Sequence, residues 1–201
     1  MNLFFPGTIY CAACGGLLSG GKGLALCEAC AEELRFPEGR VCAKCGKPLR
    51  AESEADCCGD CESLGHIFSQ GFAATCYSGF AMALVRDMKY RDRPYYAPVI
   101  TELMSERWRS FVDPETGETP QFDILTNVPV SPKKKKYRGF DQAELVASAL
   151  AGKIGTPFAP GLLRRVRDTA VQSSLSIGER RANLKGAFAV SVASRGEVAG
   201  K

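Results

Sequence analysis

Eight of the ten cysteines repeat one spacing, C-x2-C-x12-C-x2-C, in two copies that are 31 residues apart. The same shift aligns Gly15 with Gly46 and Leu18 with Leu49, which indicates an internal duplication. Four thiolates are the ligand set of a tetrahedral structural zinc, and with sulfur at every position no site is open to water. The pattern therefore predicts two structural Zn2+ ions, with the ligands Cys11, Cys14, Cys27, Cys30, Cys42, Cys45, Cys58 and Cys61.

Two other chemistries use paired cysteines, a redox CxxC site and an iron–sulfur cluster, and four pairs at one fixed offset favour zinc over both. We expect the ligands to be grouped sequentially within each copy, although a cross-braced arrangement, with Cys11 and Cys14 sharing a zinc with Cys42 and Cys45, fits the same spacing. In both arrangements about 30 residues per copy bury too little apolar surface to fold alone, so zinc binding supplies the missing free energy.

The second candidate site is a basic segment that follows a short apolar run, Ile124 to Val130. After it, apolar residues recur at helical spacing from Ala143 to Ile154. A strand, a cationic glycine loop and a helix N-terminus form an anion-binding layout, because unpaired N–H groups and the helix dipole add to the side-chain charges. We therefore predict a pyrophosphate or phosphate site at Ser131, Lys133, Lys134, Lys135, Lys136, Arg138 and Gly139. The alternative is a solvated lysine-rich loop.

A third cationic stretch ends an extended segment that begins at Phe158. Its arginines and a following glutamine are candidate contacts for phosphate or nucleic acid: Arg164, Arg165, Arg167 and Gln172.

These residues need a scaffold, and the sequence predicts one of class α/β. Helical periodicity starts at Gly79 and resumes from Pro98 to Phe111, with Met104 and Trp108 on the inward side. Ser176 and Glu179 form a capping box for a short helix, and residues 187–192 have the pattern of a strand. Alternating strands and helices imply a mostly parallel sheet. We expect two domains, a double zinc ribbon at 1–64 and an α/β domain at 71–201.

The acidic and basic residues are also distributed unequally between the two expected domains. Residues 1–70 carry 6 Lys and Arg against 9 Asp and Glu, whereas residues 71–201 carry 20 against 13. A polyanion should therefore meet the second part first. The acidic ribbon part, made more negative by its thiolates, is better suited to contact with protein or to a structural role.

No segment approaches the roughly 20 apolar residues of a membrane span, and the first ten residues lack the cationic start of a signal peptide. We therefore expect a cytoplasmic protein. In that reducing compartment regularly spaced cysteines favour metal binding over disulfides.

Several motifs together resemble the ComF family. They are the paired CxxC knuckles, Met88-Lys89-Tyr90, Asp123, Val128-Pro129-Val130, Arg138-Gly139-Phe140-Asp141-Gln142-Ala143, Arg164 through Thr169, Gln172, Arg180-Arg181, Asn183-Leu184 and Phe188. The resemblance covers nearly the whole chain. Asp141 stands where the family usually has asparagine.

The ComF resemblance implies a double zinc ribbon followed by a type I phosphoribosyltransferase-like domain, in a protein associated with bacterial DNA uptake. Family members carry a phosphoribosyl pyrophosphate loop, with two acids, two threonines and a glycine, just after the position of Lys201. We therefore expect the domain to lack its C-terminal part, through truncation or because the sequence is a fragment, and this form to catalyse no phosphoribosyl transfer. Mg2+ and phosphoribosyl pyrophosphate are expected only where that motif is present. No catalytic residue is assigned.

Three functions are compatible with these patterns. The first is a phosphoribosyltransferase-like ComF protein linked to natural competence. The second is a non-catalytic factor that handles single-stranded DNA through the basic segment and the three arginines. The third is a scaffold that docks through its ribbons on another DNA-uptake protein.

Overall fold

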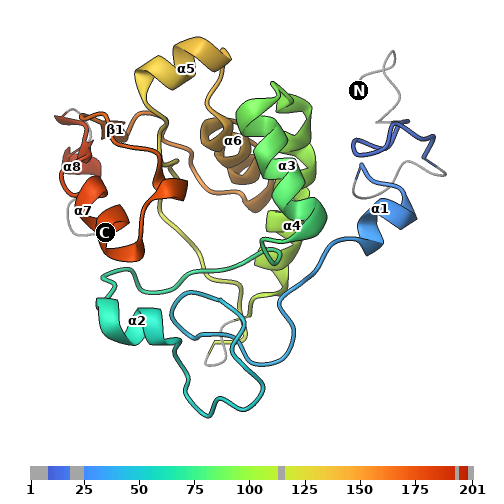
Figure 1. Ribbon diagram of the computed structural model, residues 1–201, viewed down its shortest axis with the longest axis horizontal. Coiled ribbons are helices and arrows are strands. Elements are labelled where there is room, and N and C mark those ends of the chain that lie inside the picture. The colour runs from blue at the N-terminus through green and yellow to red at the C-terminus, as the bar shows by residue number, and fades with distance from the viewer. Residues whose placement is uncertain (1–8, 19–24, 113–115, 193–194, 199–201) are drawn as a thin grey trace. The chain divides into compact units, whose positions relative to one another are not determined.

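The computed structural model describes residues 9–18, 25–112, 116–192 and 195–198 (Figure 1). The chain divides into two compact units, Met1–Pro120 and Gln121–Lys201. The predicted boundary between residues 64 and 71 falls within the first unit. Residues 1–8, which bear on the signal peptide, and residues 199–201, which end the sequence, lie outside the described residues. None of the described helices is both long enough and apolar enough to cross a membrane.

The first unit begins with two ribbons whose backbones repeat each other. In the first, Cys11 N donates to Gly16 O at 2.7 Å, and in the second Cys42 N donates to Lys47 O at 2.8 Å. A short helix follows the third cysteine of each copy, α1 (Glu28–Glu32) and α2 (Gly59–Leu64), as Figure 1 shows. The duplication predicted from sequence is therefore confirmed in the backbone hydrogen bonds.

The rest of the first unit is helical, with α3 (Gly79–Tyr90), the 3-10 turn η1 (Pro94–Tyr96) and α4 (Ala97–Ser110). The periodicity of α3 predicts an inward stripe of Phe80, Leu84 and Met88. Leu84 and Met88 are buried together with Ala81, whereas Phe80 is half-buried. The helix ends before Pro94, which cannot continue a helix. The predicted inward position of Met104 is wrong, because its side chain is 37% exposed.

The second ribbon packs directly on a neighbouring segment of the first unit. Gly71 N donates to Lys44 O at 2.7 Å, which brings the backbone of residues 71–73 against the metal knuckle. Phe72 then contacts the rings of Trp108 and Phe111 edge-on, with ring centroids 5.5 and 4.4 Å away. This contact joins a zinc ribbon to the aromatic end of α4.

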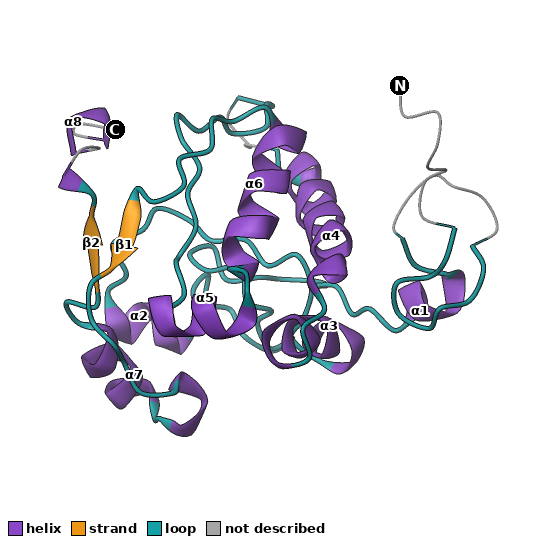
Figure 2. Ribbon diagram, turned by 90° about the horizontal axis from the view of Figure 1, so that it is seen from above, coloured by secondary structure: helices purple, strands orange, loops and turns teal. Residues whose placement is uncertain are grey.

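The second unit contains α5 (Pro132–Arg138), α6 (Gln142–Ile154), β1 (Leu163–Arg165), η2 (Gln172–Ser174), α7 (Ile177–Leu184), β2 (Phe188–Val190) and α8 (Arg195–Val198). Strands β1 and β2 pair antiparallel, with Arg164 opposite Ala189 (Figure 2). Leu125 and Phe158 form a single parallel bridge.

The mostly parallel sheet predicted from sequence is not found among the described residues, whose one sheet has two antiparallel strands. The region after the ribbons is mostly helical. The apolar run at 124–130 has strand-like composition, but a strand needs a partner along its length, and here it meets one only at the Leu125 bridge. The composition of this segment does not show whether another strand lies beside it to form hydrogen bonds.

The lysine run is helical, which corrects the predicted loop. Ser131 caps α5 by accepting a hydrogen bond from Lys134 N, and Pro132 occupies the first turn. Gly139 ends the helix in the left-handed conformation, at φ 82°. The lysines between these signals are good helix formers, so the boundary residues decide the conformation.

The close approach at Gly46 gives a first prediction. Gly46 and Gly15 have nearly equal φ angles, 72° and 74°, so an alanine at either position incurs the same left-handed strain of about 1–2 kcal/mol. At Gly46 the added Cβ would lie 2.9 Å from Gly71 O, whereas at Gly15 it would meet nothing within 4 Å. We expect Gly46→Ala to lower the free energy of unfolding by about 1–3 kcal/mol more than Gly15→Ala does, measured by urea denaturation of the zinc-loaded protein. Equal losses would show that the contact with residues 71–73 contributes nothing.

Candidate functional site

The eight predicted ligands form two clusters. The sulfur atoms of Cys11, Cys14, Cys27 and Cys30 lie within 4.8 Å of one another, and so do those of Cys42, Cys45, Cys58 and Cys61. Zn–S bonds of about 2.3 Å place tetrahedral sulfurs about 3.8 Å apart. The Sγ atoms are 3.7 Å apart in the Cys14–Cys27 pair and 3.8 Å apart in the Cys45–Cys58 pair, which fits. The chain thus has two four-cysteine sites suited to zinc, with ligands grouped within each copy rather than cross-braced.

The backbone prepares one thiol of each cluster for a metal. Burial raises the pKa of Cys11, but N–H groups donate to its sulfur and bring the pKa down to about 6; the donors belong to Cys14, Cys27 and Ala13. In the second ribbon the same three positions, 31 residues later, likewise outweigh burial and lower the pKa of Cys42 to about 6. A thiol with this pKa is mostly thiolate at neutral pH, which is the form that binds zinc.

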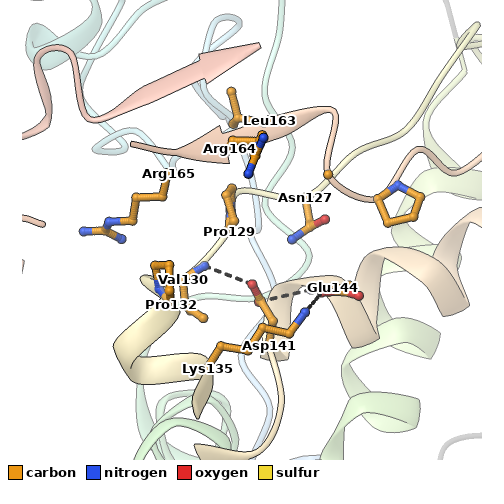
Figure 3. Close-up of a pocket in the computed structure, with 12 residues that line it drawn as sticks. Asn127, Pro129, Val130, Pro132, Lys135, Asp141, Glu144, Leu163, Arg164 and Arg165 are labelled. Atoms are coloured by element: carbon orange, nitrogen blue, oxygen red, sulfur yellow. Dashed lines mark hydrogen bonds and ion pairs between the residues drawn. The ribbon is translucent and has the colours of Figure 1, made fainter. Parts of the chain in front are cut away.

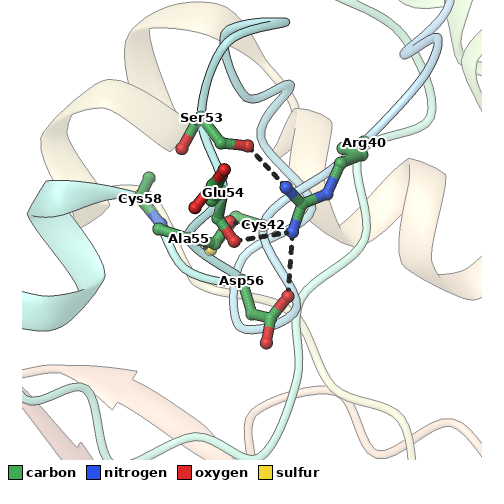
Figure 4. A network of polar contacts seen from close by, with 7 residues as sticks. All are labelled: Arg40, Cys42, Ser53, Glu54, Ala55, Asp56 and Cys58. Carbon is green, nitrogen blue, oxygen red and sulfur yellow. Dashed lines mark hydrogen bonds and ion pairs between the residues drawn. The ribbon is translucent and has the colours of Figure 1, made fainter.

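The second ribbon has an additional clamp around its metal site. The Arg40 guanidinium donates to the carbonyl oxygens of Ser53, Glu54 and Ala55, at 2.5, 3.1 and 3.3 Å, and to the Asp56 carboxylate at 3.0 Å (Figure 4). One side chain thereby holds the loop that leads into Cys58. Sequence reasoning missed Arg40, because nothing local marks a side chain that folds back over 13 residues.

The first ribbon lacks these charges. A shift of 31 residues places Ile9 at the position of Arg40, and Ala25 at that of Asp56. Its ligands are also more accessible, since Cys14 is exposed and Cys27 and Cys30 are half-buried, whereas three of the four ligands in the second ribbon are buried. The two sites therefore share ligands and backbone but differ in protection.

The second unit contains a cavity of about 440 Å³ that joins two of the predicted cationic stretches (Figure 3). Asn127, Pro129 and Val130 form one wall, α5 and the start of α6 form another, and the turn at Pro160–Gly161 with β1 closes the third. Among the predicted anion-binding residues, it brings together Lys135, Arg164 and Arg165.

Within this cavity the acidic groups are already occupied. Asp141 is buried and accepts from Val130 N, Ala143 N and Glu144 N, so the first amides of α6 are satisfied by a protein carboxylate. Glu144 accepts from Lys135 Nζ at 2.6 Å, and that hydrogen bond raises the pKa of Lys135. The helix N-terminus expected to bind the anion is thus capped by Asp141, an N-cap role that its place before the helix could have indicated.

The arginines of β1 supply the remaining positive charge. Arg164 is exposed, and no hydrogen bond or ion pair joins its side chain to another described residue. Arg165 donates to Thr169 Oγ1 and lies over the Phe188 ring, while its Nε is buried without a hydrogen-bond partner among the described residues. Arg164 is therefore the cation of this cavity that is freest to bind an anion.

The other predicted anion-binding residues all lie outside the cavity lining. Lys133 pairs with Asp168 at 3.1 Å, and Arg138 donates to Gln142. Lys134 and Lys136 are exposed on α5. Ser131 and Gly139 cap that helix at its two ends. The basic segment therefore contains residues with three roles: one lines the cavity, some cap the helix and others face the solvent.

Arg167 has a structural contact in place of a free guanidinium. It donates to the carbonyl oxygens of Asn183 and Lys185, both at 2.8 Å, at the C-terminal end of α7. Asn183 in turn bonds the N–H and C=O of Ala170, each at 3.1 Å. The main-chain carbonyl oxygen of Gln172 accepts a hydrogen bond from Arg180 Nε at 2.8 Å. These residues fix the segment from 167 to 185, and the predicted capping box of Ser176 and Glu179 is confirmed at its helix start.

Comparison with known proteins identifies the N-terminal domain and shows relatives that extend over most of the chain. Residues 1–62 match the family model of the double zinc ribbon domain. The first 62 residues are a double zinc ribbon. DNA utilization protein YhgH of Salmonella typhi is 27% identical over 171 residues, which are 85% of this chain and 73% of that protein. Competence protein F of Haemophilus influenzae is 26% identical over 193 residues, or 96% of this chain and 80% of the relative.

YhgH of Escherichia coli strain K12 is 24% identical over 171 residues, again 85% of this chain and 73% of the relative. The chain is thus a homologue of competence protein F and YhgH over most of its length, which confirms the family-level resemblance. No solved structure matches it.

The unequal double zinc ribbon gives a second prediction. We expect a chromophoric chelator to remove zinc in two phases, with the first ribbon losing its metal first, because only the second has the Arg40 clamp. Arg40→Ala should speed the slow phase about fivefold, equivalent to about 1 kcal/mol for partly exposed charge-assisted hydrogen bonds. The exposed Arg50 of the same ribbon is the matched control, and Arg50→Ala should leave both phases unchanged. Alkylation of the released thiols, read by mass spectrometry, assigns each phase; slow-phase zinc released from Cys11–Cys30 would contradict this prediction.

Proposed function

We propose that this protein acts in competence or DNA utilization, the processes for which its relatives are named, and that its second unit is a phosphoribosyltransferase-like domain with an anion site for pyrophosphate or a phosphate ester. The observation that carries the anion site is the cavity that joins Lys135 on α5 with Arg164 and Arg165 on β1. Guanidinium groups bind phosphate oxygens through paired donors, and Arg164 has its donors available.

The surrounding charge supports an anionic ligand. Residues 131–201 hold 14 Lys and Arg against 5 Asp and Glu. The two acids that line the cavity are engaged, Asp141 by backbone amides and Glu144 by Lys135. An entering anion therefore meets cations before free carboxylates. In a form of the protein that carries the family's ribose-phosphate motif, Mg2+ and phosphoribosyl pyrophosphate are the ligands this proposal expects.

One observation favours a second candidate function, the binding of single-stranded DNA to exposed side chains of α5. Lys134 and Lys136 are exposed there, and the Tyr137 ring beside them is 96% exposed. Lysines that track a phosphate backbone and a ring on which a base stacks are the two components of sequence-tolerant single-strand binding.

Calorimetric titration of inorganic pyrophosphate into the 201-residue protein tests the anion site. Arg164→Ala should weaken binding tenfold or more, since a charge-assisted hydrogen bond contributes about 1.5–3 kcal/mol. Lys134→Ala removes the same charge from a residue that does not line the cavity and should leave the affinity within twofold. If both variants weaken pyrophosphate binding equally, the site is no more than diffuse positive charge and the proposal is wrong.

The same two variants, together with Lys136→Ala, test whether single-stranded DNA binds to α5. On α5, Lys134→Ala and Lys136→Ala should each weaken binding of a single-stranded oligonucleotide and make its salt dependence shallower by about one phosphate contact. Binding that responds to Arg164→Ala but to neither lysine variant would place the DNA in the cavity instead of on α5.

A further inference from the structure

The metal knuckles of the two ribbons are superposable in their hydrogen bonding. We name them knuckle 1, residues 11–15, and knuckle 2, residues 42–46. Gly15 N donates to Cys11 O at 2.9 Å, and Gly46 N donates to Cys42 O at 2.8 Å. The next link repeats as well, because Ala12 N bonds Ala25 O and Ala43 N bonds Asp56 O, both at 2.8 Å. Because their backbones are hydrogen-bonded in the same way, the two knuckles present equivalent surfaces to neighbouring groups.

Knuckle 2 has that face covered by a peptide segment. Gly71 N donates to Lys44 O at 2.7 Å, and a Cβ on Gly71 would lie 3.3 Å from Cys45 Cα. On the other side a Cβ on Gly46 would lie 2.9 Å from Gly71 O and 3.0 Å from Ala73 N. Two glycines therefore allow two backbones to touch. Phe72, between the contacts, directs its ring away to Trp108 and Phe111.

No described residue covers the same face of knuckle 1. The carbonyl that corresponds to Lys44 O belongs to Ala13, and no hydrogen bond from a described residue reaches it. A Cβ on Gly15 would meet nothing within 4 Å. A cleft of about 590 Å³ lies over the knuckle instead, and Arg93, Tyr95 and Pro98 form its opposite wall.

We propose that knuckle 1 is a docking site for an extended peptide segment of a partner protein, seated as residues 71–73 are seated on knuckle 2. The segment would place a glycine against Gly15, donate an N–H to Ala13 O and direct a following aromatic side chain into the cleft. Tyr10 and Tyr95, each 54% exposed, line that cleft and offer rings for the aromatic side chain to pack against.

The chemistry of the cleft favours a peptide over a nucleic acid. Ala13 O accepts an N–H, which a peptide backbone provides at every non-proline residue and a sugar–phosphate backbone does not provide. Cys11 and Cys14 also line the cleft, and four thiolates around Zn2+ carry a net charge of −2, which repels phosphate. A second copy of this chain is the weaker occupant, since its own residues 71–73 already cover its knuckle 2.

The test uses the segment that already binds a knuckle. The probe is a peptide of residues 67–75, IFSQGFAAT, titrated into the isotope-labelled, zinc-loaded 201-residue protein with amide shifts followed by NMR. We expect saturable shifts at Ala13, Cys14 and Gly15. A probe with Gly71→Val should bind at least tenfold more weakly, because its side chain blocks the backbone contact, and changing the probe leaves the folding of the protein untouched.

Matched protein variants locate the cleft. Tyr95→Ala removes one wall and should weaken peptide binding at least fivefold. Tyr90→Ala removes a ring that is 73% exposed and outside the cleft lining, and should have no effect.

The proposal is overturned if the peptide causes no shifts at millimolar concentration, if the shifts are confined to Lys44–Gly46, or if the Gly71→Val probe binds equally well. Shifts at knuckle 1 from single-stranded DNA but not from peptide would also overturn it. If the protein dimerises with concentration and the amide shifts of Ala13–Gly15 change without peptide, a second copy of the chain occupies the cleft. That result would contradict docking of a partner protein.

Discussion

The two four-cysteine clusters, whose geometry suits zinc, are the feature on which the N-terminal part of this protein depends. In the second ribbon the fully buried cluster consists of three of the ligands themselves, Cys42, Cys58 and Cys61, with only a few partly buried residues around them. A segment of about 30 residues with so small an apolar interior is held by metal binding, which contributes directly to its folding free energy. The helices that follow the third cysteine in each copy, and the close packing at Gly46, rest on that metal-centred frame.

The two copies of the ribbon differ in the contacts that hold them and in the accessibility of their metal ligands. The second copy has Arg40, which holds its loop, and a neighbouring chain segment that covers its knuckle. The first copy has Ile9 in place of that arginine, and no described residue donates a hydrogen bond to its Ala13 carbonyl. The ligands and backbone geometry are the same in both. A protein that keeps two copies of one metal site can thus use one as part of its scaffold and leave the other available to a partner.

The parts of this fold that sequence predicts are those with a local signal. Helix α3 and the capping box of Ser176 and Glu179 depend on residues a few positions apart, and the cysteine repeat is recognised by its fixed spacing; all three are found. Four consecutive lysines have no apolar period, so α5 is visible only in its boundary residues, Ser131 and Gly139. The expected parallel sheet depended on pairing between distant segments. The roles of Arg40 and Arg167 depend on carbonyl groups 13 to 18 residues away, which no composition reveals.

The grouping of the zinc ligands is the central claim, and cadmium substitution tests it most directly. In the protein loaded with cadmium-113, each metal nucleus couples through sulfur to the β-protons of the cysteines that bind it. The structure predicts two resonances, one correlated with Cys11, Cys14, Cys27 and Cys30 and the other with Cys42, Cys45, Cys58 and Cys61. A single resonance, or one correlated with Cys11, Cys14, Cys42 and Cys45, would contradict the two-ribbon arrangement and the comparison of knuckles that follows from it.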